Sequence, residues 1–257
     1  MNSTEEVIIR VENFTAGYDD VVILDNISFA VNRGEVFVIL GGSGCGKSTL
    51  LKHMIGLLEP LAGRILIDGD DIVTAHGQER RRILAKTGVM FQTGALFGSM
   101  TLLENVRLAL EEFTDLPREA ADLVASMKLE LVGLRGFEGH MPAELSGGMK
   151  KRAAIARAMV LDPEILFLDE PSAGLDPVTS AELDELIVNL SKNLKMTFVI
   201  VTHELPSVFD VADRVIMLEK NTGKIAASGS PEQLSRIKDK PLVWEFFHTQ
   251  KYPRMDD

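Results

Sequence analysis

Residues 41–48 read Gly-Gly-Ser-Gly-Cys-Gly-Lys-Ser and constrain the fold of this chain more than any other segment. They follow an apolar run at 36–40 and precede a stretch of helix-forming residues at 49–55. Glycine tolerates the backbone angles and the close approach that let several N–H groups point into one concavity. The helix that we expect to begin here adds the positive end of its dipole. The pattern therefore predicts a phosphate-binding loop, and a glycine-rich turn that binds nothing is the weaker alternative.

This loop predicts contacts with a nucleoside triphosphate. Lys47 would neutralise the β and γ phosphates, and the Ser48 hydroxyl would ligate Mg²⁺. The residues of the loop that we expect to bind ATP are Gly41, Gly42, Ser43, Gly44, Cys45, Gly46, Lys47, Ser48 and Thr49.

Bulk composition narrows the class of protein. The chain has 257 residues, 46% of them hydrophobic and 25% charged, which is typical of one folded domain with a substantial core. Its longest uninterrupted apolar stretches fall well short of the roughly 20 residues that a membrane-spanning helix needs. The net charge of −11 disfavours nucleic acid as a partner. A single cysteine excludes an internal disulfide, and the first residues lack a secretory signal, so we expect a cytoplasmic location.

The hydrophobic pattern predicts an α/β fold. Antiparallel strands are expected at 7–11 and 27–31, before the phosphate loop. Apolar runs without alternation are typical of strands that are buried on both faces, in a largely parallel sheet covered by helices. The further strands are expected at 64–68, 87–91, 165–168, 197–201 and 215–218.

Helical patterns fill the intervals between several of these strands. Residues 99–160 carry almost no strand signal, and Thr101 and Glu104 have the spacing of a capping box, so we expect a helical insertion here. A later helix follows Asp176-Pro177, where Thr179 and Glu182 are also spaced as a capping box.

Two acidic residues follow the apolar run at 165–168. Asp169 and Glu170 would lie at the carboxyl end of a buried strand, where open α/β sheets bind ligands. We expect Asp169 to hold Mg²⁺ through water and Glu170 to polarise the water that attacks the γ-phosphate. A surface Asp-Glu pair is the alternative, and the phosphate loop upstream weakens it.

A second anion site is predicted where Ser146, Gly147 and Gly148 precede a run of helix formers. A helix N-terminus with exposed N–H groups and no bulky side chain can bind an anion, although an ordinary N-cap is the favoured explanation when the pattern is taken alone. We expect the basic runs at 150–152 and 80–82 to be solvated helix faces.

The order of these motifs resembles the nucleotide-binding subunit of an ABC transporter. The resemblance rests on Leu-Ser-Gly-Gly at 145–148, the strand ending at Asp169-Glu170, Ser-Ala-Gly-Leu-Asp at 172–176 and the following His203, and it runs from about 7 to 234. It implies a P-loop NTPase (RecA-like) core with an antiparallel β subdomain and an inserted helical subdomain. It also implies a homodimer whose two subunits enclose two ATP molecules head to tail.

The resemblance assigns roles to residues that would otherwise be ambiguous. Tyr18 would stack on adenine, and Gln92 would link Mg²⁺ and the attacking water to the transmembrane partner. Asp176 would cross the dimer interface, and His203 would contact the γ-phosphate. Without the family, Tyr18 is a turn aromatic, Gln92 a strand-end polar residue and His203 a loop histidine. The ATP-binding domain that the resemblance implies would span 7–240, with the RecA-like core at about 7–92 and 161–240 and the helical subdomain at about 93–160. A tail would follow at 241–257.

Three segments resemble the ATPases of Mla-type and other Mce-associated lipid transport systems. They are 91–97, 132–136 and 141–149. This implies a chain on the cytoplasmic face of the bacterial inner membrane that powers phospholipid transport between inner and outer membranes. The implied partners are multi-span permease subunits, a periplasmic Mce-type lipid-binding protein and a small regulatory subunit.

The sequence leaves several alternatives open for the packing and the function of this chain. Leu96 and Phe97 belong either to the core or to a permease-docking surface, and residues 241–252 pack either on their own subunit or on a neighbour. An importer of a small polar solute would share every catalytic motif. A non-transport ABC ATPase would need a second cassette, a coiled-coil insertion or zinc-binding cysteines, which the sequence lacks.

Cys45 supports a separate expectation about reactivity. The helix dipole and nearby Lys47 favour its thiolate, whereas an apolar neighbourhood would oppose it. We expect a reactive thiol whose maleimide adduct inhibits ATP hydrolysis, and whose labelling MgATP prevents.

Overall fold

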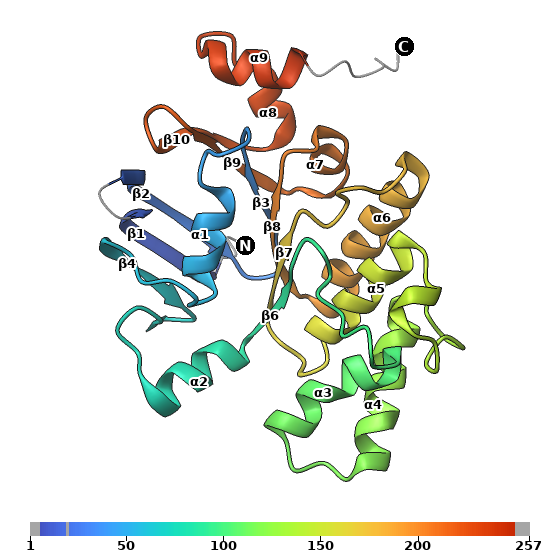
Figure 1. Cartoon of the computed structure of the whole chain (residues 1–257). Coiled ribbons are helices and arrows are strands. Elements are labelled where there is room, and N and C mark those ends of the chain that lie inside the picture. The colour runs from blue at the N-terminus through green and yellow to red at the C-terminus, as the bar shows by residue number, and fades with distance from the viewer. Residues whose placement is uncertain (1–5, 19–20, 250–257) are drawn as a thin grey trace, which may run out of the picture.

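Within residues 6–18 and 21–249, which the computed structural model describes, the chain forms two β-sheets surrounded by helices (Figure 1). The strands are β1 (Val7–Tyr18), β2 (Val21–Asn32), β3 (Val36–Leu40), β4 (Ala62–Ile67), β5 (Asp70–Asp71), β6 (Thr87–Met90), β7 (Ile165–Asp169), β8 (Thr197–Thr202), β9 (Arg214–Glu219) and β10 (Lys224–Gly229). The helices are α1 (Lys47–Met54), α2 (Gly77–Ala85), α3 (Leu102–Phe113), α4 (Arg118–Leu131), the 3₁₀ helix η1 (Pro142–Glu144), α5 (Gly147–Ala158), α6 (Pro177–Leu194), α7 (Leu205–Val211), α8 (Pro231–Ser235) and α9 (Pro241–Thr249). The predicted α/β fold class is confirmed.

The smaller sheet is antiparallel and has the strand order β2-β1-β4-β5 in the described part of the chain. β1 pairs with both β2 and β4 in antiparallel register. Both strands of the β1–β2 hairpin extend well beyond the segments that the sequence predicts. The strand predicted at 64–68 exists as β4 and belongs to this sheet, not to the parallel one.

The larger sheet has the order β10-β9-β3-β8-β7-β6. β3 runs parallel to β8 and β9, and β7 runs parallel to β6 and β8. β10, which the sequence did not indicate, pairs antiparallel with β9 at the edge. Because β3, β7 and β8 run in the same direction, their carboxyl ends lie at one edge of the sheet. The loops that follow these strands carry the residues with predicted chemistry.

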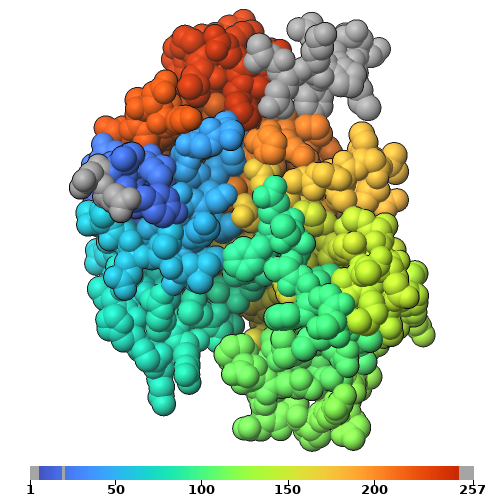
Figure 2. Space-filling view, in the orientation of Figure 1, coloured from blue at the N-terminus to red at the C-terminus, as the bar shows by residue number. Residues whose placement is uncertain are grey.

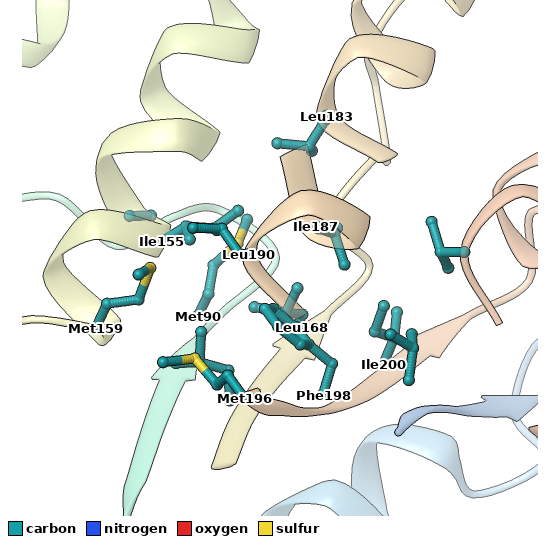
Figure 3. Close-up of a cluster of buried hydrophobic side chains, with 14 of the residues drawn as sticks. Met90, Ile155, Met159, Leu168, Leu183, Ile187, Leu190, Met196, Phe198 and Ile200 are labelled. Atoms are coloured by element: carbon teal, nitrogen blue, oxygen red, sulfur yellow. The ribbon is translucent and has the colours of Figure 1, made fainter. Parts of the chain in front are cut away.

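Helices cover the larger sheet on both faces. Along β3, Val36, Val38 and Leu40 pack into one hydrophobic core, while Phe37 and Ile39 pack into the other. α1 contributes Leu50, Leu51 and Met54 to the core with Phe37, and α5 and α6 pack on the opposite face. Figure 3 shows part of the α5–α6 core, where Ile155, Met159, Leu183, Ile187 and Leu190 meet Met90, Leu168, Met196, Phe198 and Ile200.

Between β6 and β7 the chain forms α3, α4, η1 and α5. The predicted capping box at the start of α3 is confirmed, because the Thr101 hydroxyl accepts from the Glu104 N–H and the Glu104 carboxylate accepts from the Thr101 N–H. The segment that joins β6 to α3 lies at the molecular surface in Figure 2, between the blue region around α1 and the yellow-green region around α5.

The capping box predicted for α6 is wrong. The N-cap is Asp176, whose carboxylate accepts from the N–H groups of Val178 and Thr179. Because the helix begins at Pro177, Thr179 already lies in its first turn and donates its hydroxyl to Asp176 at 2.6 Å. Glu182 lies on the next turn and contacts Arg152.

The arginine run at 80–82 is only partly the solvated face that the sequence predicted. Arg80 donates to the carbonyl oxygens of Ile72, at 2.8 Å, and Gly56, so it joins α2 to the turns before it. Arg81 and Arg82 are exposed, and Arg82 pairs with Asp70 at 3.0 Å.

The described part of the tail packs on its own subunit. Val243 and Phe247 of α9 are buried, and the Phe247 ring meets that of Phe209 edge to face at 6.0 Å. Residues 250–257, which include the rest of the predicted tail, lie outside the described residues. In the described part of the chain, every helix is too short or too polar to cross a bilayer.

Candidate nucleotide-binding site

The loop between β3 and α1 has a backbone that only glycine accommodates at key positions. Gly46 has a φ of 100°, and a Cβ there would lie 2.9 Å from the Ile23 side chain. At Gly41 a Cβ would lie 2.5 Å from the Cys45 sulfur and 2.9 Å from the Leu218 carbonyl oxygen. The loop is therefore held tightly against β9 and the antiparallel sheet. Of its other predicted binding residues, Gly42, Ser43, Gly44 and Ser48 are exposed, and Thr49 is half-buried.

Lys47 lies at the centre of the site. Its Nζ donates to the carbonyl oxygens of Gly41 at 2.8 Å and Gly42 at 3.4 Å, and it lies 3.9 Å from Oε1 of Glu170. The side chains of Lys47 and Glu170 are both buried. The predicted phosphate-binding cation and the predicted water-orienting carboxylate are therefore neighbours.

Glu170 and His203 meet at the ends of two adjacent parallel strands. His203 Nδ1 lies 2.9 Å from Oε1 of Glu170. Glu170 follows β7 directly, has a φ of 47° and donates its N–H to the Val201 carbonyl oxygen at 2.8 Å. A positive φ is costly for a residue with a side chain, so the surrounding structure must hold Glu170 in this conformation.

Buried oxygens at this edge are suited to a cation or water. Among the described residues, Oδ1 of Asp169 and Oε2 of Glu170 are buried and have no hydrogen-bond partner. Burial, and next the charge of Glu170, raise the pKa of Asp169, while a hydrogen bond from the Ser48 hydroxyl opposes the rise. Buried acceptors normally have partners, so these two oxygens indicate a place for a further ligand.

The donor set suits Mg²⁺. This ion commonly takes one or two protein oxygens and completes its shell with water and substrate phosphates. Ser48 and Asp169 supply such oxygens beside the phosphate loop. Within the described residues, no group of three or more His, Cys, Asp or Glu side chains is placed to hold a metal ion.

Gln92 lies just after β6, and its side chain is exposed. Its carbonyl oxygen accepts from Nζ of Lys151 at 2.6 Å, and the same ammonium group donates to the Glu170 carbonyl oxygen at 3.1 Å. The prediction that residues 150–152 form a solvated face is wrong for Lys151, which is buried. Helical spacing could have shown this, since Lys151 shares a face with Gly148 and Ile155.

The second predicted anion site is the N-terminus of α5. Ser146 is the N-cap and accepts from the Met149 N–H at 3.2 Å. A Cβ on Gly148 would lie 2.4 Å from Cγ2 of Thr179, so this turn packs tightly on the start of α6, which Asp176 caps. α1 and α5 cover opposite faces of the sheet, so the Ser146 turn lies beside the start of α6 and not beside the phosphate loop of its own chain (Figure 1).

Tyr18 ends β1, pairs with Val21 and is 45% exposed. Residues 19–20 beside it lie outside the described residues. Its ring is therefore accessible to a ligand at the end of the antiparallel sheet.

The predicted reactivity of Cys45 is wrong in direction. The side chain is buried in the core that includes α1, and this burial raises the pKa of the thiol more than Lys47 lowers it. The thiol therefore packs inside the phosphate loop, and only its backbone is available to a nucleotide.

The family described as ABC transporter matches residues 24–173, which carry the phosphate loop, the Ser146 turn and the Asp169-Glu170 pair. The chain belongs to this ABC transporter family. It is an ATP-binding and ATP-hydrolysing subunit of the ABC type, as the sequence predicts.

Within this family, the chain is similar over most of its length to two curated relatives and to one solved structure. The chain is 39% identical to the intermembrane phospholipid transport system ATP-binding protein MlaF of Haemophilus influenzae, over 97% of this chain and 96% of that protein. It is 41% identical to a probable ribonucleotide transport ATP-binding protein, mkl, of Mycobacterium leprae, over 95% of this chain and 70% of that protein. The dimeric ATP-binding cassette MJ0796, bound to ADP and Pi, superposes with a TM-score of 0.78 at 30% identity, over 87% of this chain and 98% of that one. The predicted resemblance to the Mla ATPases is confirmed.

Proposed function

We propose that this chain hydrolyses ATP where the phosphate loop meets the ends of β7 and β8. The observation that carries the proposal is the convergence of Lys47, Glu170 and His203, with Oε1 of Glu170 3.9 Å from Lys47 Nζ and 2.9 Å from His203 Nδ1. Lys47 would bind the β and γ phosphates. Glu170 would orient the attacking water and accept its proton, and His203 would contact the γ-phosphate.

Ser48 and Asp169 would hold Mg²⁺, Ser48 directly and Asp169 through water. When bound, the ion neutralises phosphate charge as the bond to the leaving oxygen breaks. Gln92 would approach this ion and the water from the segment after β6. Tyr18 would stack on the adenine ring, and the loop N–H groups would bind phosphate oxygens.

The catalytic unit that we propose is a homodimer. Ser146, Gly147, Gly148 and Asp176 would bind the nucleotide held by the partner's phosphate loop. The proposal is supported by the position of α5 on the sheet face opposite α1, and by the dimeric state of the similar cassette MJ0796. In this arrangement the domain spans 7–240, with its RecA-like core at about 7–92 and 161–240, its helical subdomain at about 93–160 and a tail at 241–257.

The transported substrate that we propose is phospholipid, moved between inner and outer membranes. The support is similarity over nearly the whole length to a protein named for intermembrane phospholipid transport. The chain would bind multi-span permease subunits at the cytoplasmic face of the inner membrane, with a periplasmic Mce-type lipid-binding protein and a small regulatory subunit as further partners. Phe97 lies in the segment after β6 that also contains Gln92, is 49% exposed and suits permease docking, whereas Leu96 is half-buried against the core.

Reconstitution with the permease tests this function. Mass spectrometry should find phospholipid in the purified complex, and ATP should drive transfer of a fluorescent phospholipid between vesicles. A complex that carries Glu170→Gln is the matched control, because it should assemble and bind lipid without sustained transfer. Absence of lipid, together with ATPase activity stimulated by a soluble periplasmic solute receptor, would favour a small-solute importer. Stimulation by ribonucleotides would favour the transport named for the mycobacterial relative.

A further inference from the structure

Lys151 joins two segments that the proposed reaction requires. Its Nζ donates to the carbonyl oxygen of Gln92 at 2.6 Å and to that of Glu170 at 3.1 Å. The two acceptors belong to loops that follow neighbouring strands, β6 and β7. The donor comes from α5, and Lys151 is only 7% exposed. Burying a lysine costs free energy unless its charge and its N–H donors have partners, so the burial of Lys151 requires such partners.

The backbone of Glu170 shows what the lysine stabilises. Glu170 has a φ of 47°, in the left-handed region that disfavours a residue with a side chain. Its N–H is bonded to Val201 of β8, and its C=O accepts from Lys151, so both sides of the residue are fixed from other elements. This fixed backbone determines where the Glu170 carboxylate lies relative to Lys47 and His203.

Charged groups surround the Lys151 ammonium. Burial lowers the pKa of Lys151 below its ordinary value, and the carboxylates of Glu204, Asp169 and Glu170 in the loops around it oppose this shift. The ammonium group therefore has negative charge around it as well as carbonyl acceptors. An apolar side chain of the same length would fill the space but leave both carbonyl oxygens without this donor.

We propose that Lys151 is a positioning residue for ATP hydrolysis, whose ammonium group holds Gln92 and Glu170 at a fixed separation. The inference rests on the proposed role of Glu170. It also connects the two nucleotide sites of the proposed dimer, because Ser146, five residues before Lys151 on the same helix, would contact the partner's nucleotide.

The test compares four forms of the full chain in the assembled complex: wild type, Lys151→Met, Lys151→Arg and Lys150→Met. Methionine keeps the length of the side chain and removes the donor. Arginine keeps a charged donor. Lys150 is the matched control because it is the adjacent lysine on α5 and is only half-buried. The readouts are kcat, KM for ATP, nucleotide affinity and the thermal midpoint of unfolding.

Lys151→Met should lower kcat by about tenfold or more, since a small misplacement of a catalytic group costs this much. KM and nucleotide affinity should stay within about twofold, which separates positioning from loss of binding. Lys151→Arg should recover part of kcat, and Lys150→Met should match the wild type. An unchanged kcat in Lys151→Met would overturn the proposal. So would parallel losses of kcat, nucleotide affinity and thermal midpoint, because these would indicate a purely structural role.

Glu170→Gln, assayed beside these variants, separates this inference from the proposed function. If Glu170→Gln loses turnover while Lys151→Met does not, the site assignment stands and the role of Lys151 is wrong. If Glu170→Gln itself hydrolyses ATP at the wild-type rate, the site assignment is wrong.

Discussion

Nδ1 of His203 lies 2.9 Å from Oε1 of Glu170. The two residues follow the neighbouring parallel strands β8 and β7, and the positive φ of Glu170 turns its side chain toward this pairing. The contact fixes one carboxylate oxygen. The other, Oε2, is buried and has no hydrogen-bond partner among the described residues, so it is the oxygen suited to accept a hydrogen bond from water.

Replacing His203 with alanine should slow hydrolysis without abolishing ATP binding. The variant loses the contact that orients Glu170 and the proposed contact with the γ-phosphate. We expect kcat to fall by about 10–100-fold, because the group acts in the reaction step more than in binding. Steady-state kinetics and a fluorescent nucleotide titration measure the two effects separately. A fall in nucleotide affinity as large as the fall in kcat would contradict this role.

Mixed dimers test whether the sites are shared. Ser146→Arg damages the α5 end, and Lys47→Ala damages the phosphate loop. If each site combines one subunit's loop with its partner's Ser146 turn, a mixed dimer has one site with both lesions and one with neither. In a 1:1 mixture about half of the dimers are mixed and each has one intact site, so mixing should restore nucleotide occlusion to about a quarter of wild type, whereas each mutant homodimer shows little. No gain on mixing would rule out shared sites.

Asp184 makes the free energy of unfolding depend on pH. Burial, followed by the charges of Asp210 and Glu204, raises the pKa of Asp184 from 3.8 to about 6, while a hydrogen bond with Ser207 opposes the rise. Because the folded pKa is the higher one, folding favours the protonated form. The contribution to stability is therefore complete at low pH and is lost as pH rises from about 4 through 6.

Asp184→Asn should remove this loss. We expect a higher free energy of unfolding at pH 7, by at most about 3 kcal/mol, and a flatter stability profile between about pH 4 and 6. Urea titrations at several pH values measure both. Glu185→Gln, on the exposed side of the same helix, is the matched control and should leave the profile unchanged. An Asp184→Asn profile that parallels the wild type would show that this carboxyl does not titrate as described.

Cys45 should react slowly in the folded protein. Burial keeps the thiol protonated at neutral pH, so maleimide labelling should be at least about tenfold slower than in urea. Cys45→Ser should still hydrolyse ATP, because the loop binds through its backbone. Mass spectrometry over a time course follows the labelling. Rapid modification of the native chain, prevented by MgATP, would restore the original expectation of a reactive thiol.

Local patterns predicted much of the phosphate loop and of the strand ends. Gly46, Lys47 and Glu170 are identified by neighbours in the sequence, because the loop needs glycine at fixed spacing and the acidic pair directly follows an apolar strand. The order of the motifs then indicated the family. The β1–β2 hairpin is longer than predicted and β10 was not predicted, although each strand pairs with its neighbour in the sequence. The residues of β2 and β10 are mostly exposed or half-buried and form no continuous apolar run.

Tertiary packing decided the features that the sequence did not predict. Lys151 belongs to a basic run that resembles a solvated face, and only the packing of α5 against the loops after β6 and β7 buries it. Arg80 likewise departs from the predicted solvated face, because it donates to the carbonyl oxygens of Ile72 and Gly56 in other turns. The sequence does not decide on which side of its loop the Cys45 side chain lies. In the structure this side chain packs in the core with residues of β9 and α1.

The central claim is that Glu170 commits bound ATP to hydrolysis. Its most direct test is the ATPase rate of Glu170→Gln in the assembled complex, measured beside nucleotide affinity and the amount of ATP-dependent dimer, with Glu185→Gln as control. We predict nearly unchanged affinity, an accumulated dimer and a rate about 10²–10⁴-fold below wild type, as expected for loss of a general base. A Glu170→Gln complex that hydrolyses ATP at the wild-type rate would contradict the claim.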